Sequence, residues 1–196
     1  MWVWIIVAVV VFILIIMMVG IYNRLVRAKN QYANAFAQID VQLKRRYDLI
    51  PNLVEIAKGY AKHEKETLDA VVKARNTAMS ALESVGGNIG DPSAMQALGD
   101  AESGLLGALG KLNVVVEAYP DLKANTSMEQ LMEELSSTEN KIAFSRQAFN
   151  DAIMTYNIAR ERFPAIVFSG MLGFGSKEQL EIQFPDGGRE APKVEF

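Results

Sequence analysis

The chain has 196 residues, half of them hydrophobic, and a formal net charge of −3. It contains one histidine and no cysteine, which excludes disulfides, thiolate metal sites and any metal site that needs paired histidines. The charge is uneven: residues 22–50 carry six basic and two acidic side chains, a net of +4, so the rest of the chain carries −7. An acidic body argues against nucleic acid as a partner, because nucleic-acid-binding proteins show a basic face.

The first 22 residues have the composition of a membrane span. No side chain from Trp2 to Val19 is polar, and the first charged residue is Arg24. As a helix, residues 2–22 would extend roughly 31 Å, close to the hydrocarbon thickness of a bilayer. A secretory signal peptide would have a basic start and a small-residue cleavage site, and neither is present. We therefore predict a transmembrane anchor over residues 1–22.

Basic residues follow this span and none precedes it. The positive-inside rule then predicts a single-pass protein of the cell inner membrane, with its N-terminus outside and its body in the cytoplasm. Cations near the span can also meet anionic lipid headgroups, at about 1 kcal/mol for each well-placed charge. The candidate contacts to lipid or to an acidic partner are Arg24, Arg27, Lys29, Arg45 and Arg46.

Apolar residues recur three and four apart from Tyr22 to Leu82, the spacing of a helix with a coiled-coil-like seam. Pro51 interrupts this stripe, and Asp48 is placed to cap a new helix that would begin there. The chain therefore either kinks or folds back at residues 48–51. The unbroken apolar phase favours a kink. Length favours a fold-back, because a helix of about 60 residues would overhang every later helix.

A glycine-rich loop over residues 84–92 separates this stripe from a second one. Asp91 as the cap and Pro92 as the first helical residue predict the start of a helix that runs to Tyr119. Glycines inside it indicate close approach of a neighbouring segment or a frayed helix. They are Gly99, Gly104, Gly107 and Gly110.

Thr126 and Glu129 have the spacing of a capping box and predict a third helix, which Pro164 ends. Alternation of Leu180 and Ile182 with polar residues is a weak strand signal, and the residues from 185 onward are typical of a tail. The apolar groups after Pro164 exceed what one bundle core needs, which favours an interface between copies of the chain. The candidate oligomer contacts are Phe168, Met171, Leu172, Phe174, Ile182 and Phe184.

Three stretches resemble the LemA family of bacterial membrane-anchored helical proteins. They are QLKRRYDLIPNLV at residues 42–54, YPDLKAN at 119–125 and STENKI at 137–142, the last extending to Arg146, Phe149-Asn150, Tyr156-Asn157, Phe163-Pro164 and Gly173-Phe174. The resemblance implies an all-α fold: an N-terminal transmembrane helix followed by an antiparallel four-helix bundle with long helices. It thereby tips the choice at Pro51 towards a fold-back. It implies no established enzymatic activity. Some members are linked to shaping intracellular membranes, as in magnetosome formation, and others are thought to act near envelope proteases.

The chain departs from the family at two places that bear on function. It has no lipobox cysteine, and the part after Phe174 matches poorly. We therefore divide it into the anchor, a helical-bundle domain over residues 23–175, and a C-terminal extension over residues 176–196 with a possible edge strand.

Polar residues within the matching stretches admit two interpretations. They are either a structural network that pairs across the bundle, or a recognition surface in which Arg45 and Arg46 meet an acidic partner. The candidates for the network are Asp48, Asn52, Glu139, Asn140, Arg146, Asn150 and Asn157.

We predict no catalytic, cofactor or metal site. The single histidine, His63, lies in a charge-rich stretch and is interpreted as a surface residue. Two functions remain: a scaffold that self-associates and organises or shapes the bacterial membrane, or an adaptor of a membrane protease or envelope-stress system. The expected partners are membrane lipids and further copies of the chain, with a membrane protease or another envelope protein as the alternative.

Overall fold

The computed structural model describes residues 1–182, and within them the regular secondary structure is all helix, with no strand. The all-α class predicted from the sequence is therefore confirmed for this part of the chain. The helices are α1 (Trp2–Tyr60), α2 (Lys65–Val85), α3 (Pro92–Ala118), α4 (Pro120–Lys123), α5 (Thr126–Glu161) and α6 (Ala165–Ser169).

The first helix is one continuous rod of 59 residues that contains Pro51 in its interior. Neither a fold-back nor a new helix begins at that proline, so the predicted corner and the Asp48 cap are wrong. Proline at position 51 removes the N–H that would have bonded to the Tyr47 carbonyl, four residues earlier. Arg75 of α2 supplies the missing donor, with its Nε 3.0 Å from that carbonyl oxygen. The unbroken spacing of apolar residues, which favoured a continuous helix, therefore predicted α1 better than the argument from helix length.

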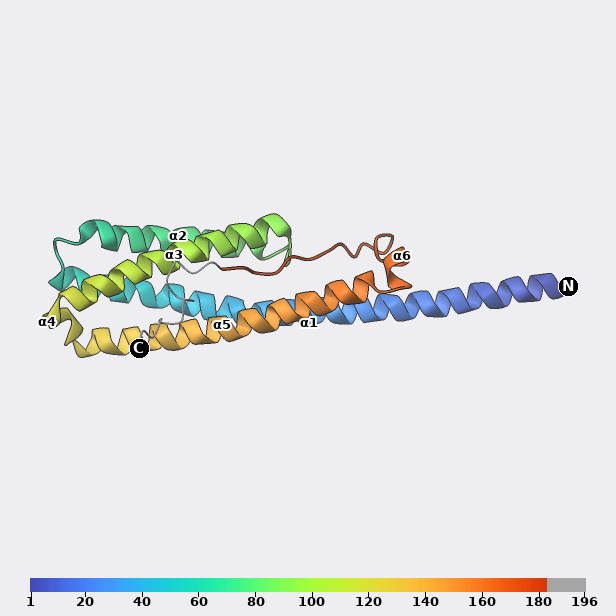
Figure 1. Ribbon diagram of the computed structural model, residues 1–196, viewed down its shortest axis with the longest axis horizontal. Helices are drawn as coiled ribbons and strands as arrows, with labels where there is room; N and C mark the ends of the chain where they lie inside the picture. The colour runs from blue at the N-terminus through green and yellow to red at the C-terminus, as the bar shows by residue number, and fades with distance from the viewer. Residues whose placement is uncertain (183–196) are drawn as a thin grey trace, which may run out of the picture.

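The chain reverses direction after Tyr60, ten residues beyond the predicted place. Ala61 ends α1 and is fully buried, and its N–H still bonds to the Ala57 carbonyl. The turn closes with Glu64, and α2 then runs back along the end of α1 that is remote from the N-terminus (Figure 1). Helix α1 nevertheless overhangs its neighbours, because its apolar N-terminal part extends alone beyond the rest of the molecule.

The predicted start of α3 is confirmed. The Asp91 side chain accepts a hydrogen bond from the Ala94 N–H at 3.1 Å, and Pro92 is the first helical residue. The cap of α5 is one residue earlier than predicted. Asn125, rather than Thr126, accepts from the Met128 N–H at 3.0 Å.

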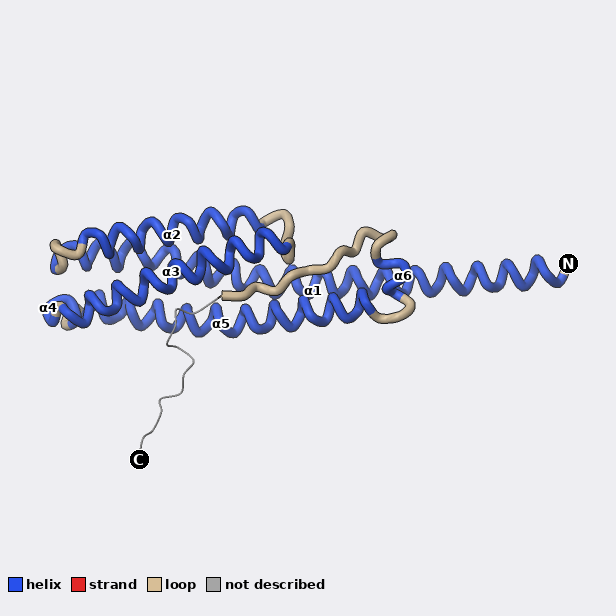
Figure 2. The backbone as a smooth tube through the Cα atoms, turned by 45° about the horizontal axis from the view of Figure 1, so that its top comes forward, coloured by secondary structure: helices blue, strands red, loops and turns tan. Residues whose placement is uncertain are grey.

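Four long helices share one core. Helix α5 packs antiparallel along α1, and the rings of Tyr32 and Tyr156 meet edge to face at 5.2 Å, as do those of Phe36 and Phe149 at 5.4 Å. Helix α2 packs on both α1 and α3. Figure 2 shows α2 and α3 beside the part of α1 remote from the N-terminus, while α1 and α5 continue together towards it.

Beyond α6 the chain returns along α5 as an extended segment without regular structure (Figure 1). Phe174, Leu180 and Ile182 are buried in the common core, so this segment belongs to the body. Residues 180 and 182 are not in a strand within the described chain: the Asn150 amide bonds to the backbone of Leu180, and Arg146 donates to the Ile182 carbonyl. Phe184 and the predicted tail lie outside the described residues.

Candidate functional site

A cluster of charged and polar side chains is buried where α1, α3 and α5 meet. Arg46 of α1 is 1% exposed and forms an ion pair with Glu102 of α3, which is 0% exposed. The hydroxyl of Tyr47 donates to the same carboxylate. Glu139 of α5 is half-buried and interacts electrostatically with Arg46. Three helices are thus tied together by one buried cation and two carboxylates.

Burial dominates the electrostatics of this cluster. It lowers the pKa of Arg46, a shift that Tyr47 and Glu139 oppose. It raises the pKa of Tyr47 to about 12, so the phenol stays neutral and remains a donor. It also raises the pKa of Glu139, against the attraction of Arg46. Arg46 is thus the cation that faces both carboxylates of the cluster.

This cluster positions helices; it offers no open reaction site. Its carboxylates face a guanidinium and a phenol inside the body. Among residues 1–182, no group of three or more histidine, aspartate or glutamate side chains is arranged to hold a metal ion.

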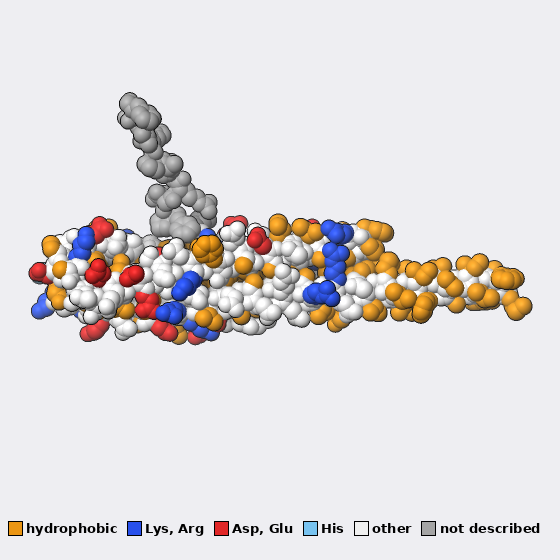
Figure 3. Space-filling model, turned by 90° about the horizontal axis from the view of Figure 1, so that it is seen from below, with side chains coloured by type: hydrophobic (Ala, Val, Ile, Leu, Met, Phe, Trp, Pro, Cys, Tyr) orange, Lys and Arg blue, Asp and Glu red, His pale blue; other side chains and the backbone are white. Residues whose placement is uncertain are grey.

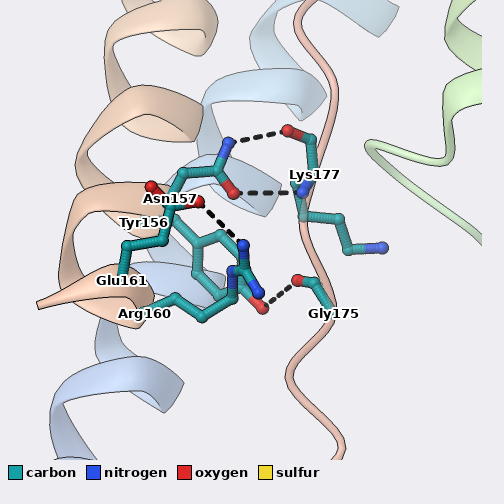
Figure 4. Close-up of polar contacts among 6 residues, drawn as sticks. All are labelled: Tyr156, Asn157, Arg160, Glu161, Gly175 and Lys177. Carbon is teal, nitrogen blue, oxygen red and sulfur yellow. Dashed lines mark hydrogen bonds and ion pairs between the residues drawn. The ribbon is translucent and has the colours of Figure 1, made fainter. Parts of the chain in front are cut away.

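A second polar arrangement fixes the C-terminal segment to α5 (Figure 4). The Asn157 amide donates to the Lys177 carbonyl at 2.8 Å, and its oxygen accepts from the Lys177 N–H at 3.1 Å. One heptad earlier, Asn150 makes the same two bonds with Leu180, at 3.2 and 2.9 Å. Two asparagine amides thus satisfy backbone groups of a segment that has no strand partner.

Two more residues of α5 bond to the C-terminal segment in addition to Asn150 and Asn157. The Tyr156 hydroxyl donates to the Gly175 carbonyl at 2.8 Å (Figure 4), and Arg146 donates to the Ile182 carbonyl at 3.4 Å. On the other side, the segment presses against α3. A Cβ atom at Gly99 would collide with the carbonyl oxygen of Glu181, so glycine is required there. The prediction of close approach therefore holds at this glycine. At Gly104 and Gly110 a Cβ atom would meet open space.

Some residues of the predicted polar network belong to the buried cluster or bond to the C-terminal segment, and others lie on helix surfaces. Glu139, Arg146, Asn150 and Asn157 take part in the interactions described above. Three other members, Asp48, Asn52 and Asn140, are exposed on helix surfaces.

Two residues that bind α1 were missed by sequence reasoning: Glu102 in the buried cluster, and Arg75, which bonds to the Tyr47 carbonyl. Glu102 had a detectable signal. It lies between Leu98 and Leu105 in the apolar phase of α3, where a charge is out of place unless it is paired.

The basic residues predicted to contact lipid lie in different environments. Arg46 cannot meet lipid or a partner, because it is buried. Arg45 is exposed but pairs with Glu134 of α5. Since α1 is continuous, Arg45 lies about 35 Å along the helix from Tyr22, too far to reach headgroups beside the span. Arg24, Arg27 and Lys29 are exposed within the first two turns after the span, where headgroups would lie.

The predicted oligomer contacts are mostly used within the chain. Phe174 and Ile182 are buried in its own core, which corrects their assignment to an exposed patch. Phe168 and Leu172 are half-buried, and Met171 is exposed.

Within the described part of the chain, one helix is long and apolar enough to cross a membrane. Its most apolar stretch of 18 residues has a mean hydropathy of 3.3, and the body buries no part of that stretch. Figure 3 shows a band of Lys and Arg side chains near the end of the body from which this bare apolar helix extends.

Fold and surface together define a membrane-associated helical protein whose leading helix continues into its body. The chain belongs to the LemA family, whose profile matches residues 35–196. Magnetosome protein MamQ of Magnetospirillum gryphiswaldense is 28% identical over 168 residues, which cover 78% of this chain and 62% of the relative.

Two further relatives agree with this membership. MamQ 2 of Paramagnetospirillum magneticum is 28% identical over 175 residues, 82% of this chain and 64% of the relative. Protein LemA of Metamycoplasma hominis is 29% identical over 139 residues, 71% of this chain and 59% of the relative. The chain thus spans less than two thirds of each of these relatives.

Proposed function

We propose that this protein is a non-enzymatic scaffold of the bacterial inner membrane, which self-associates through its body and organises or shapes the bilayer. The continuity of α1 carries this proposal. The same helix that provides the apolar span supplies one wall of the body's core, from Leu25 to Ala57. A body joined in this way has no flexible linker, so an assembly of bodies would fix the tilt and spacing of the spans.

The body is proposed to act as the antiparallel four-helix rod expected for the family. Its α5 flank supports self-association, because Phe144 is 76% exposed and Met154 and Ile158 are also exposed. Their spacing places all three on one side of the helix. Exposed aromatic and methionine side chains are the types enriched at protein interfaces. The magnetosome names of two of the relatives named above accord with a role in membrane organisation.

The test is the mass of the full-length protein in mild detergent, with Phe144→Ser as the interface variant. Val114→Ser on α3 is the matched control, since Val114 is a comparably exposed apolar residue on another helix. We expect an oligomer for the natural chain and the control, and a monomer for Phe144→Ser. Substitution is preferable to truncation after Gly173, because removal of Phe174, Leu180 and Ile182 would open the core.

A monomer for all three proteins would contradict self-association. The adaptor function would then take its place, and recovery of the chain with a membrane protease would support it.

We also propose that the body is cytoplasmic and the N-terminus lies outside. Lys65, which is exposed at the start of α2 and remote from the span, is the position for a single introduced cysteine. In intact cells an impermeant thiol reagent should leave it unlabelled and should label it after lysis. Labelling before lysis would reverse the orientation.

A further inference from the structure

The connection after α5 exposes an unusual set of large apolar side chains. Phe163 is 79% exposed, Ile166 55%, Val167 57% and Met171 84%. They belong to α6 and the residues beside it, at the end of the body nearest the N-terminus (Figure 1).

This segment is folded in place with its apolar side outward. Ala165 and Ser169, one turn apart, are buried and face the body. Helix α6 contacts both α1 and α5. The Phe174 ring, which follows it, meets Tyr22 edge to face at 5.7 Å. The exposure is therefore a property of an ordered element.

The segment also lies beside the end of the span. A small hollow is lined jointly by Ile21 and Arg24 of α1 and by Arg162, Phe163 and Ala165. Ile21 belongs to the apolar run of α1, and Arg24 is its first charge. In Figure 3 hydrophobic side chains of the body reach past the band of Lys and Arg towards the bare apolar helix.

We propose that residues 163–171 form a membrane foot, a second attachment that inserts Phe163, Ile166, Val167 and Met171 into the interface of the bilayer crossed by α1. Arg24, Arg27 and Arg162 would meet anionic headgroups at the same level. Short amphipathic elements bind bilayers in this way, through buried apolar side chains and flanking cations.

The bilayer is favoured over a protein partner because the foot's position is fixed relative to the span. Helix α1 is continuous from the span into the body, and Ile21 lines the same hollow as Phe163 and Ala165, so a membrane that holds residues 2–21 must bring its interface to α6. Two attachments on one rigid body fix its rotation and tilt, which a single span leaves free. The inference depends on membrane insertion and is independent of self-association.

The test uses the full-length protein, which has no natural cysteine. Met171→Cys and, as the control, the exposed Val114→Cys on α3 each carry an environment-sensitive fluorophore. The labelled chain is placed at one copy per nanodisc of phosphatidylcholine with a minor share of phosphatidylglycerol. At position 171 we expect blue-shifted emission, several-fold less quenching by aqueous iodide than at position 114, and quenching by lipids spin-labelled near the headgroup.

Equal iodide quenching at the two positions would overturn the foot. Protection of position 171 that appears only with several copies per disc would also overturn it, and would assign this surface to a second chain. Val167→Cys is a second probe on the same exposed side. If the substitution or the label disturbs the structure at Met171, position 167 still tests the foot. Since single copies suffice, failure of self-association leaves this test intact.

Discussion

Arg46 and Glu102 form an ion pair closed inside the body, with side chains 2% and 0% exposed. The pair joins α1 to α3, two helices separated in the chain by the whole of α2. Such pairs seldom add net stability relative to apolar residues, but breaking one leaves an uncompensated charge. We interpret it as the device that fixes the register of α3 against α1.

Arg46→Met should therefore destabilise the body by about 3–5 kcal/mol, because the carboxylate of Glu102 loses its cation. The triple variant that combines Arg46→Met with Glu102→Leu and Tyr47→Phe should recover most of that loss of stability. Urea unfolding of the full-length protein in detergent, followed by circular dichroism, measures both. An Arg46→Met protein as stable as the natural chain would show that the pair does not act as described.

Glu139→Gln should change how stability depends on pH. Burial raises the pKa of Glu139 in the folded protein above its ordinary value of 4.5. The folded state therefore holds this proton more tightly than the unfolded state, and stability falls as pH rises through the window between the two pKa values. Glutamine has no proton to lose, so the variant should lack this decline. Urea midpoints measured from pH 4.5 to neutral compare the two; parallel curves would contradict the prediction.

Gly99→Ala and Gly104→Ala form a matched pair on α3. Alanine favours a helix over glycine by about 1 kcal/mol, and at Gly104 a Cβ atom has open space, so that variant should gain stability. At Gly99 the Cβ atom would strike the Glu181 carbonyl and displace the C-terminal segment. Hydrogen exchange at residues 177–182 should rise in Gly99→Ala alone. Equal exchange in both variants would mean that the close approach is not required.

Periodicity predicted most of the helices, because burial of an apolar stripe is a local pattern in the sequence. It kept α1 in phase through Pro51, while the capping residue Asp91 and Pro92 gave the start of α3. It could not show that Arg75, on the next helix, would satisfy the carbonyl freed by that proline. That bond is a tertiary contact, and no spacing records it. The reversal at Ala61 was missed because its turn carries no proline or glycine.

The candidate site was predicted in part for the same reason. Asn150 and Asn157 were candidates because they belong to the stretches that resemble the LemA family, but their partners are backbone groups of residues 177–180, which have no sequence signature. Exposed Asp48 lies within α1, so Asp48→Ala should cost nothing, where a cap would have cost about 1 kcal/mol.

A hydrogen bond from α2 satisfies the backbone carbonyl that Pro51 leaves free in α1. The Tyr47 carbonyl has no partner within α1 because Pro51 has no N–H, and Arg75 Nε of α2 donates to it at 3.0 Å. Arg75→Met should leave a half-buried carbonyl unsatisfied and cost about 1–3 kcal/mol. Lys73→Met, on the exposed side of the same helix, is the control and should be near neutral.

A double-mutant cycle isolates this role. In a Pro51→Ala background the new N–H at position 51 can bond to the Tyr47 carbonyl, so the same Arg75→Met change should cost clearly less than in the natural chain. The four proteins are compared by urea unfolding in detergent. An equal cost of Arg75→Met in both backgrounds would mean that Arg75 stabilises the body in another way. A positive coupling would show that Arg75 acts through the carbonyl that Pro51 leaves free, and hence that a contact with α2 supports α1 at its proline.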